Sequence, residues 1–290
     1  MQWKDRQGNI LPYDDSKSPA LQFLYGKAFG RMILPVLSKP WVSFAAGRFM
    51  DSGVSRLFIR GFVKKNGIDI SSYEDRRYRS FNDFFTRRLK PGKRDIDMRA
   101  DHLIAPCDSK LSVYPITEDS HFEIKGTEYT LASLIKDEVL AKEYYGGQLL
   151  IFRLTVDDYH RYCYIDSGEK GNNIHIKGVY HTVNPIACER YPIYKENTRE
   201  YSVIKNTSFG DVIMMEVGAL LVGRIVNHHG AQTVTRGCEK GMFEFGGSTV
   251  VVAVQKDCVI IDSDILQNTI DGFETVVKIG EKIGEREVKQ

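Results

Sequence analysis

The sequence predicts an α+β fold, in which an N-terminal helical region is followed by a mostly antiparallel β core. Residues from about 17 to 90 read as short amphipathic helices divided by Gly and Pro, whereas from about residue 103 onward short β-type runs alternate with Gly and Asn turns. The 290 residues are 42% hydrophobic and 27% charged, which is typical of a globular chain with a sizeable core and excludes a disordered one. We therefore predict a helical region over residues 1–95 and a β-rich core over residues 96–290.

The helical region is strongly basic, although the net charge of the whole chain is small. Between Leu21 and Lys65 there are eight bases and one acid, a net charge of +7, in a chain whose total is +2. Aromatic residues interleaved with bases on short helices suit an interfacial contact with an anionic membrane. The alternative is a helical cap packed on the core with its bases in solvent. The residues that we expect at the membrane are Lys27, Arg31, Trp41, Arg56 and Arg60, with the aromatic residues Phe23, Phe29 and Phe44 beside them.

Further elements follow in order along the chain. Pro35 and Pro40 are expected to break the basic stretch into helices that are too short to span a bilayer. Ser80 is a candidate N-cap for the helix that follows it, and residues 129–142 are expected to form one short helix. The strands that we expect in the core include Leu149–Leu154, Ile174–Val179, Val212–Val217 and Ser248–Val254.

Composition excludes several classes of protein. The net charge of +2 is too small to suggest nucleic-acid binding. The five cysteines include no CxxC pair and no zinc-type spacing, which indicates free thiols in a reduced compartment and no metal site. The N-terminus has no apolar signal-peptide core, and no apolar run is long enough to cross a membrane. We therefore expect a cytoplasmic protein.

Three segments carry residues of possible chemical importance. Gly246-Gly247-Ser248-Thr249 precedes an apolar strand, and its two glycines leave the backbone open to close approach by another group. His160 follows the strand Leu149–Leu154, and Asp108 follows Pro106 in a turn. An Asp, a His and a Ser together are able to form an acid–base–nucleophile relay. Each also has a plainer interpretation, namely an ordinary turn, a structural histidine and an Asx-turn.

Five segments occur in the order typical of one family. They are residues 80–92 (SFNDFFTRRLKPG), 106–108 (PCD), 158–161 (DYHR), 217–219 (VGA) and 240–249 (KGMFEFGGST). Together they resemble the phosphatidylserine decarboxylase proenzymes, and the resemblance covers roughly residues 20 to 285. Five motifs in register are far more specific than any one of them.

The resemblance implies a pyruvoyl enzyme that forms by self-cleavage between Gly247 and Ser248. Ser248 Oγ would attack the carbonyl of Gly247, with His160 as base and Asp108 orienting it. The products would be a β subunit, residues 1–247, and an α subunit, residues 248–290, whose first residue becomes the pyruvoyl cofactor. That group would form a Schiff base with the amine of phosphatidylserine and release CO2 to give phosphatidylethanolamine.

The sequence departs from the family at one position. Many members carry a second His three residues after the first, where this chain has Cys163, and a thiol with an ordinary pKa near 8.5 is a poor base at neutral pH. His181 is a candidate helper, although a strand-end histidine bonded to backbone is the plainer interpretation. His228 and His229 are given no role.

The resemblance also implies partners and a location. We expect phosphatidylserine as substrate, a heterodimer of the chain's own α and β subunits, possible pairing of two such units, and a peripheral position on the cytoplasmic face of the cell membrane. The alternatives are a pyruvoyl decarboxylase of a soluble amino acid, which leaves the +7 region unexplained, and a non-catalytic membrane-binding paralogue. A serine hydrolase is a third class, but the chain has no Gly-x-Ser-x-Gly elbow at Ser248.

Overall fold

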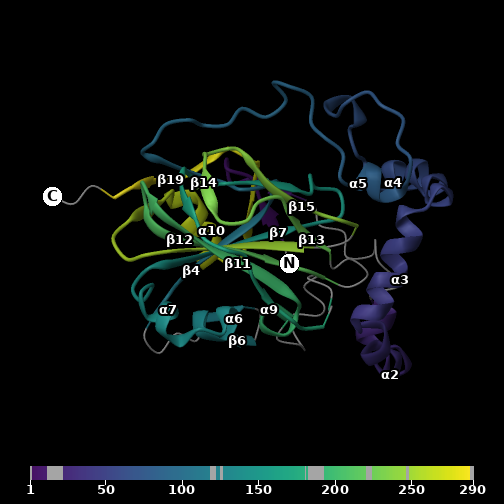
Figure 1. Ribbon diagram of the computed structural model, residues 1–290, viewed down its shortest axis with the longest axis horizontal. Coiled ribbons are helices and arrows are strands. Elements are labelled where there is room, and N and C mark those ends of the chain that lie inside the picture. The colour runs from purple at the N-terminus through teal and green to yellow at the C-terminus, as the bar shows by residue number, and fades with distance from the viewer. Residues whose placement is uncertain are drawn as a thin grey trace.

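The computed structural model describes residues 2–11, 22–117, 122–124, 127–179, 181, 193–219, 224–245 and 248–287. Within these ranges the predicted α+β fold is confirmed, because helices come first and an extensive, mostly antiparallel β core follows (Figure 1). Among the strands of these ranges, only β1 (Trp3–Lys4) and β18 (Glu274–Val277) form a parallel ladder.

The N-terminal helices are short, as the Gly and Pro punctuation predicts. They are η2 (Gln22–Gly26), α2 (Ala28–Leu37), α3 (Pro40–Asp51), η3 (Gly53–Phe58), α4 (Ile59–Asn66), η4 (Ile70–Ser72) and α5 (Phe81–Phe85). Pro40 begins α3, but the expected break at Pro35 is wrong, because Pro35 lies inside α2. Pro35 has no N–H to donate to the carbonyl of Arg31, so α2 continues to Leu37 without that one backbone hydrogen bond. Ser80 caps α5 as predicted, since its side chain accepts a hydrogen bond from Asp83 N.

Most of the core strands belong to one large sheet. The remaining strands are β2 (Ile10–Leu11), β3 (His102–Ile104), β4 (Ser109–Pro115), β5 (Phe122–Ile124), β6 (Thr127–Tyr129), β7 (Gln148–Leu154), β8 (Arg161–Cys163), β9 (Gly168–Lys170), β10 (Ile174–Ile176), β11 (Arg199–Thr207), β12 (Gly210–Val217), β13 (Ile225–Asn227), β14 (Gln232–Val234), β15 (Glu239–Phe243), β16 (Ser248–Val254), β17 (Val259–Ile261) and β19 (Lys282–Arg286). In the described chain the large sheet has the order β14-β9-β11-β12-β16-β7-β4-β18-β1-β2, with β10 paired to β11. The strand β16 therefore lies in the interior of this sheet, between β12 and β7.

Both faces of β16 are buried, which explains its nearly continuous apolar sequence. Val250, Val252 and Val254 belong to one core cluster, which includes Ile265 of α10 (Ser263–Ile270). Val251 and Ala253 belong to the cluster on the opposite face, which α6 (Leu131–Ile135) and α7 (Glu138–Lys142) help to cover. A short helix α9 (Ile193–Glu196) lies near α6.

Residues 129–142 do not form the single helix that the sequence predicts. Lys136 takes a left-handed conformation (φ 54°) that ends α6. Asp137 then starts α7, because its Oδ1 accepts a hydrogen bond from Leu140 N at 3.0 Å. The helical pattern continues across this break, so periodicity alone did not reveal it.

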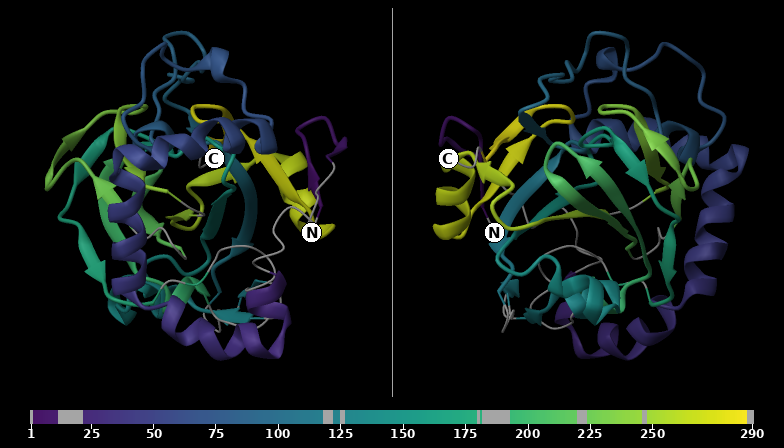
Figure 2. Two further views of the ribbon diagram at one scale, coloured as in Figure 1. Left: turned by 90° about the vertical axis from the view of Figure 1, so that its right-hand side faces the viewer. Right: turned by 60° about the vertical axis from the view of Figure 1, so that its left-hand side comes forward.

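The N-terminal helices lie along one end of the β core. Figure 1 shows α2 and α3 stacked there, with α4 and α5 following, and Figure 2 shows the same helices alongside the core from two other directions. The aromatic side chains of α5 reach the core, because Phe81 and Phe85 pack against Phe245, which follows β15. No helix in the described part of the chain is long and apolar enough to cross a membrane.

Candidate active site

Ser248 is the first residue of β16 and lies directly opposite Leu154, the last residue of β7. Its side chain is fully buried, and its Oγ has no hydrogen-bond partner among the residues that the structure describes. A buried hydroxyl without a partner is costly, and the Thr249 hydroxyl beside it shares this state, so burial alone assigns Ser248 no role. The other half of the predicted cleavage site, Gly247, lies outside the described residues, as does Gly246.

His160 is the last residue of the connection between β7 and β8. The chain leaves β7 at Leu154, opposite Ser248, and enters β8 at Arg161, which pairs with Met242 of β15. The backbone oxygen of His160 accepts a hydrogen bond from Phe243 N at 2.9 Å. The connection over residues 155–160 therefore starts beside Ser248 and ends at His160, whose backbone is bonded to Phe243.

The surroundings of His160 define which ring nitrogen carries a proton. His160 Nδ1 lies 2.9 Å from the carbonyl oxygen of Asp158, which is able only to accept a hydrogen bond. The proton of a neutral ring must therefore be on Nδ1, and the basic lone pair on Nε2. The imidazole is fully buried, with the Phe85 ring 4.0 Å from it between centroids. A neutral, oriented imidazole is the form that a general base requires.

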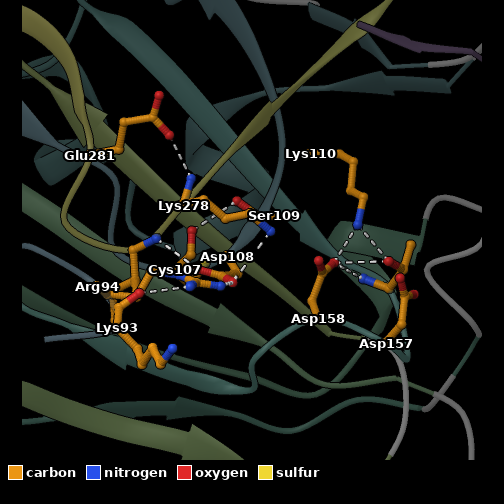
Figure 3. A network of polar contacts seen from close by, with 12 residues as sticks. Lys93, Arg94, Cys107, Asp108, Ser109, Lys110, Asp157, Asp158, Lys278 and Glu281 are labelled. Carbon is orange, nitrogen blue, oxygen red and sulfur yellow. Dashed lines mark hydrogen bonds and ion pairs between the residues drawn. The ribbon is translucent and has the colours of Figure 1, made fainter. Parts of the chain in front are cut away.

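A buried salt bridge holds the loop that carries His160. Lys110 Nζ lies 2.6 Å from Asp158 Oδ2, and both side chains are almost completely buried (Figure 3). The same carboxylate accepts hydrogen bonds from Thr155 N at 2.7 Å and Thr155 Oγ1 at 2.8 Å. The guanidinium of Arg87 donates to the backbone oxygens of Asp157 and Asp158. Asp158 is thereby fixed through both its side chain and its carbonyl group.

Asp108 does not hold His160, which corrects the relay that the sequence suggested. Its carboxylate is bound by Arg94, with Nη2 at 2.7 Å from Oδ2, by Lys278 Nζ at 3.5 Å, and by the backbone N of Ile279 at 2.9 Å (Figure 3). Two cations and an amide thus saturate a side chain that is only 2% exposed. The hydrogen bond that the Arg94 guanidinium donates to the Asp108 carboxylate also raises the pKa of Arg94. The carbonyl of Asp158 occupies the position at Nδ1 that Asp108 was expected to take.

Cys163 is a buried, neutral thiol. Its backbone N donates to Pro106 O at 2.9 Å, so it lies beside the turn that carries Asp108. Burial raises the pKa of Cys163 to about 12, which keeps a thiolate out of reach at neutral pH. A pocket of about 200 Å³ adjoins it, lined also by Arg94, Tyr159 and Arg161. Cys163 therefore does not act as the missing second base.

Comparison with known proteins identifies the family of this chain. A sequence model of the phosphatidylserine decarboxylase family matches residues 81–285. The chain is 48% identical to phosphatidylserine decarboxylase proenzyme 2 of Clostridium acetobutylicum over 93% of this chain and 92% of that one. It is 43% identical to a phosphatidylserine decarboxylase proenzyme of Ruminiclostridium cellulolyticum (91% and 90% covered) and 42% identical to one of Desulfitobacterium hafniense (92% and 91% covered). The chain belongs to the phosphatidylserine decarboxylase family.

In this family member, His181 lies near the end of the strands β12 and β16 at which Ser248 is found. Asn197 clamps its backbone, accepting from His181 N at 2.8 Å and donating to His181 O at 2.8 Å. The Asn197 amide also donates to Gly218 O at 2.7 Å, just beyond Val217, which pairs with Thr249 of β16. Burial lowers the pKa of His181, so its ring is neutral at pH 7. Residues 182–192 lie outside the described chain.

Three residues of this site were missed by sequence reasoning as functional groups. They are Lys110, which holds Asp158, Asn82, which bonds the backbone of Phe245, and Arg87, which bonds the His160 loop. A signal existed for each of them. Lys110 lies in a strand that is predominantly buried, and a buried lysine needs a partner. Asn82 and Arg87 lie within the SFNDFFTRR motif, which was recognised without a role for its members.

The N-terminal helices expose an unusual number of apolar side chains. We call the following set, with its bases, the basic–aromatic surface. The exposed apolar residues are Phe23, Phe29, Met32, Val36, Trp41, Phe44, Phe49, Val54, Leu57 and Phe58. The bases are Lys27, Arg31, Lys39, Arg48, Arg56, Arg60, Lys64 and Lys65. None of these bases forms an ion pair with a described residue, although Arg31 donates to Gly26 O. Exposed apolar side chains gathered in one region are typical of interaction surfaces.

The described residues contain no candidate metal-binding cluster. Across the ranges given above, no group of three or more His, Cys, Asp or Glu side chains is arranged to hold a metal ion. The described cysteines 107, 163, 238 and 258 form no disulfide with one another.

Proposed function

We propose that this chain is a phosphatidylserine decarboxylase proenzyme that cleaves itself between Gly247 and Ser248 and then converts phosphatidylserine to phosphatidylethanolamine and CO2. Membership of the family supports the reaction. The observation that carries the self-cleavage is the buried hydroxyl of Ser248 at the start of β16, which has no partner among the described residues and lies beside the loop that holds His160 in its basic tautomer.

The first step transfers an acyl group from nitrogen to oxygen. Ser248 Oγ attacks the Gly247 carbonyl carbon while His160 Nε2 takes the hydroxyl proton, which then passes to the departing nitrogen of Ser248. The C–N bond breaks and an ester links Gly247 to the Ser248 side chain. Loss of the Cα proton of residue 248 then expels the Gly247 carboxylate by β-elimination. Water hydrolyses the resulting dehydroalanine, releasing ammonia and leaving a pyruvoyl group.

The residues present fit that group. The pyruvoyl group would form from the atoms of Ser248. Because Ser248 is buried, bulk water is excluded from the position where the group would form. Once formed, a pyruvoyl group supplies an electron sink for loss of carboxylate from an amine substrate. The chain's own part is to exclude water and to place proton-transfer groups, namely His160 and the neutral ring of His181 as a helper. Asp108 is proposed as a positioning residue that fixes Arg94 and the backbone at Ile279.

The two subunits should remain together after cleavage. The strand β16 heads the proposed α subunit, and both of its neighbours, β7 and β12, belong to the proposed β subunit. Arg6, near the start of the β subunit, also bonds Asp262, Asp264 and Glu281 of the α subunit. Removing a central strand would break two ladders, so we propose a tight αβ heterodimer. Pairing of two such heterodimers is compatible with this arrangement.

The basic–aromatic surface supplies a means of reaching a lipid substrate. Its unpaired bases suit anionic headgroups, and its exposed rings suit the headgroup boundary. We propose peripheral attachment to the cytoplasmic face of the cell membrane through this surface. A decarboxylase of a soluble amino acid would not need the basic–aromatic surface to reach its substrate.

A pair of neighbouring hydroxyl variants tests the proposal. Ser248 and Thr249 are adjacent and fully buried, and the hydroxyl groups of both lack hydrogen-bond partners among the described residues, but the two side chains point to opposite faces of β16. We expect Ser248→Ala to remain a full-length, inactive chain, and the matched control Thr249→Val to cleave. Intact mass should show two fragments for wild type, the smaller with a blocked N-terminus, together with release of CO2 from phosphatidylserine vesicles. Cleavage of Ser248→Ala at the wild-type rate would contradict the role of Ser248.

A further inference from the structure

The segment that leads into the cleavage site is held by three successive backbone N–H groups. Phe243 N donates to His160 O at 2.9 Å and Glu244 N donates to Arg224 O at 3.2 Å. Phe245 N donates to the side-chain Oδ1 of Asn82 at 3.0 Å. The first two acceptors are backbone atoms of the core, whereas the third is a side chain from the N-terminal helical region.

Asn82 itself is held in one orientation. It is the second residue of α5 and only 5% exposed. Its Nδ2 donates to Asp51 Oδ1 at 2.8 Å, at the C-terminal end of α3. Because the amide nitrogen is directed to a carboxylate, which accepts only, the amide oxygen must face Phe245. Asp51 therefore determines which end of the amide meets the cleavage segment.

The ring of Phe245 is fixed by the same helices. It packs edge-on against Phe81 at 4.8 Å and Phe85 at 5.2 Å between ring centroids, and Phe62 of α4 lies at 6.4 Å. Phe85 in turn packs against His160. The side chain and the backbone of Phe245 are thus both bound to the helical region, on the side where His160 lies.

We propose that Asn82 is a positioning residue for self-cleavage, which acts by fixing Phe245 at one end of the Gly246-Gly247 pair. This inference rests on the proposed function. Ser248, at the other end of the pair, is fixed by its ladder partner Leu154. Glycine has the largest backbone freedom of any residue, so two glycines between fixed ends lose far more freedom than two with one end loose. Restricting the Gly247 carbonyl raises the fraction of chains in which Ser248 Oγ is within reach of it.

The helical region accordingly has a second task besides membrane contact. The acceptor for Phe245 comes from α5, and its orientation comes from α3, which also carries Trp41 and Phe44 of the basic–aromatic surface. A β core without these helices would keep Ser248 and His160 but lose the anchor at Phe245.

The test is the rate of cleavage of newly made full-length chain. Cell-free synthesis followed by a chase gives the first-order rate constant on a gel, separately from the fraction of chains that ever cleave. We expect Asn82→Ala to lower that rate constant by about 10- to 100-fold, the size of effect that small misplacements of reacting groups produce. The matched control is Asn66→Ala, which removes another amide hydrogen bond in the same region, to Phe62 O at 2.8 Å, without touching the cleavage segment. It should cleave with the wild-type rate constant.

An exchange of donor and acceptor separates positioning from general stability. Asn82→Asp keeps an acceptor for Phe245 but sets a carboxylate against Asp51, and we expect slow cleavage because like charges repel. The double variant Asn82→Asp with Asp51→Asn restores a donor facing an acceptor at unchanged net charge. It should recover most of the wild-type rate constant.

The outcomes are distinct. If wild type fails to cleave, the proposed function itself is wrong. If wild type cleaves and Asn82→Ala cleaves with the same rate constant, only the role of Asn82 is overturned. Asn82→Ala could instead lower the fraction of chains that cleave and their resistance to protease, while the chains that do cleave keep the wild-type rate constant. That result would also overturn the role of Asn82. Should Asn82→Ala fail to fold, the exchange decides, because a folded double variant no faster than Asn82→Asp contradicts the proposal.

Discussion

The Nδ1 atom of His160 lies 2.9 Å from the carbonyl oxygen of Asp158, within the loop that joins β7 to β8. The side chain of Asp158 forms a buried ion pair with Lys110 at 2.6 Å. The orientation of the proposed base therefore depends on a salt bridge that does not touch the imidazole. Breaking a buried pair leaves an uncompensated charge, which is strongly destabilising for the segment that carries it.

Lys110→Met should slow self-cleavage. The substitution preserves most of the side-chain volume but removes the cation at Asp158, so the His160 loop loses one anchor while Thr155 remains. We expect a fall in the cleavage rate constant of about 10-fold or more, since general-base catalysis contributes roughly 10²–10⁴-fold and only its alignment is impaired. Pulse–chase conversion of the full-length chain measures it.

The matched control breaks another buried ion pair. Arg236 and Asp166 are 3.1 Å apart and similarly buried, but neither contacts the His160 loop. Arg236→Met should lower the melting temperature as Lys110→Met does, with little change in the cleavage rate constant of folded chain. Equal rate constants for the two variants would mean that Lys110 contributes only to stability.

The parts of this molecule that the sequence predicted correctly depend on local or periodic signals. The strand β16 was predicted because burial of both faces makes Val250–Val254 apolar throughout. Ser80 was predicted as a cap because the residue types and spacing of a helix start are local. The proposed cleavage chemistry came from motif resemblance, which needs no contact information.

The parts that sequence could not predict depend on distant partners. Asp108 binds Arg94 and Lys278, and nothing in the chain order selects these cations over His160. The break at Lys136 depends on one residue in a left-handed conformation that lysine rarely takes. The amide of Asn82 meets Phe245 across 163 residues of sequence, so only the folded chain reveals it.

Asp108→Asn should act first on stability. The amide replaces one oxygen with a donor, so it no longer matches Arg94, Lys278 and the Ile279 N–H together. We expect a loss on the order of 2 kcal/mol, less than for a fully buried pair because Arg94 is a quarter exposed. Thermal unfolding of the uncleavable Ser248→Ala background measures it.

Arg94→Met is the comparison for Asp108→Asn, because it breaks the same ion pair from the other side. At equal melting temperature the two variants should cleave with similar rate constants. A much lower rate constant for Asp108→Asn alone would show that the carboxylate takes part in the reaction beyond its contact with Arg94.

Stability should depend on pH through His181. Burial lowers the pKa of its imidazole in the folded state, while in the unfolded chain it titrates near its ordinary value of about 6.5. The unfolded state therefore binds the proton more readily, so this stabilisation is full above about pH 6.5 and is lost as pH falls toward the folded-state pKa. Between about pH 7.5 and about pH 5, the melting temperature of the wild type should fall further than that of His181→Gln. His175→Gln, at an exposed histidine of β10, is the control and should follow wild type. Parallel curves for wild type and His181→Gln would rule out this linkage.

The basic–aromatic surface should bind anionic vesicles through its charges. Replacing Lys27, Arg31, Arg56 and Arg60 with Gln should weaken binding by up to about 1 kcal/mol per base, the usual worth of a base near an anionic surface. The matched control removes four exposed bases elsewhere, Lys142, Lys177, Lys205 and Lys256, and should bind as wild type does. Vesicle sedimentation measures both variants, and activity on detergent-dispersed substrate should fall much less than activity on vesicles.

Salt separates the two contributions of that surface. Raising the ionic strength from about 0.1 to about 1 M shortens the Debye length from about 10 to about 3 Å, so the difference between wild type and the four-base variant should shrink. Trp41 and Phe44 are 63% and 69% exposed and are proposed to bind by burial in the headgroup boundary, so Trp41→Ser with Phe44→Ser should weaken binding at every salt concentration. Self-cleavage should be unchanged in all of these variants, because none of their side chains contacts Ser248, His160 or Asn82 in the described chain. If wild-type binding is indifferent to salt and the four-base variant binds equally well, the bases are merely solvated, and the aromatic residues alone would carry the attachment.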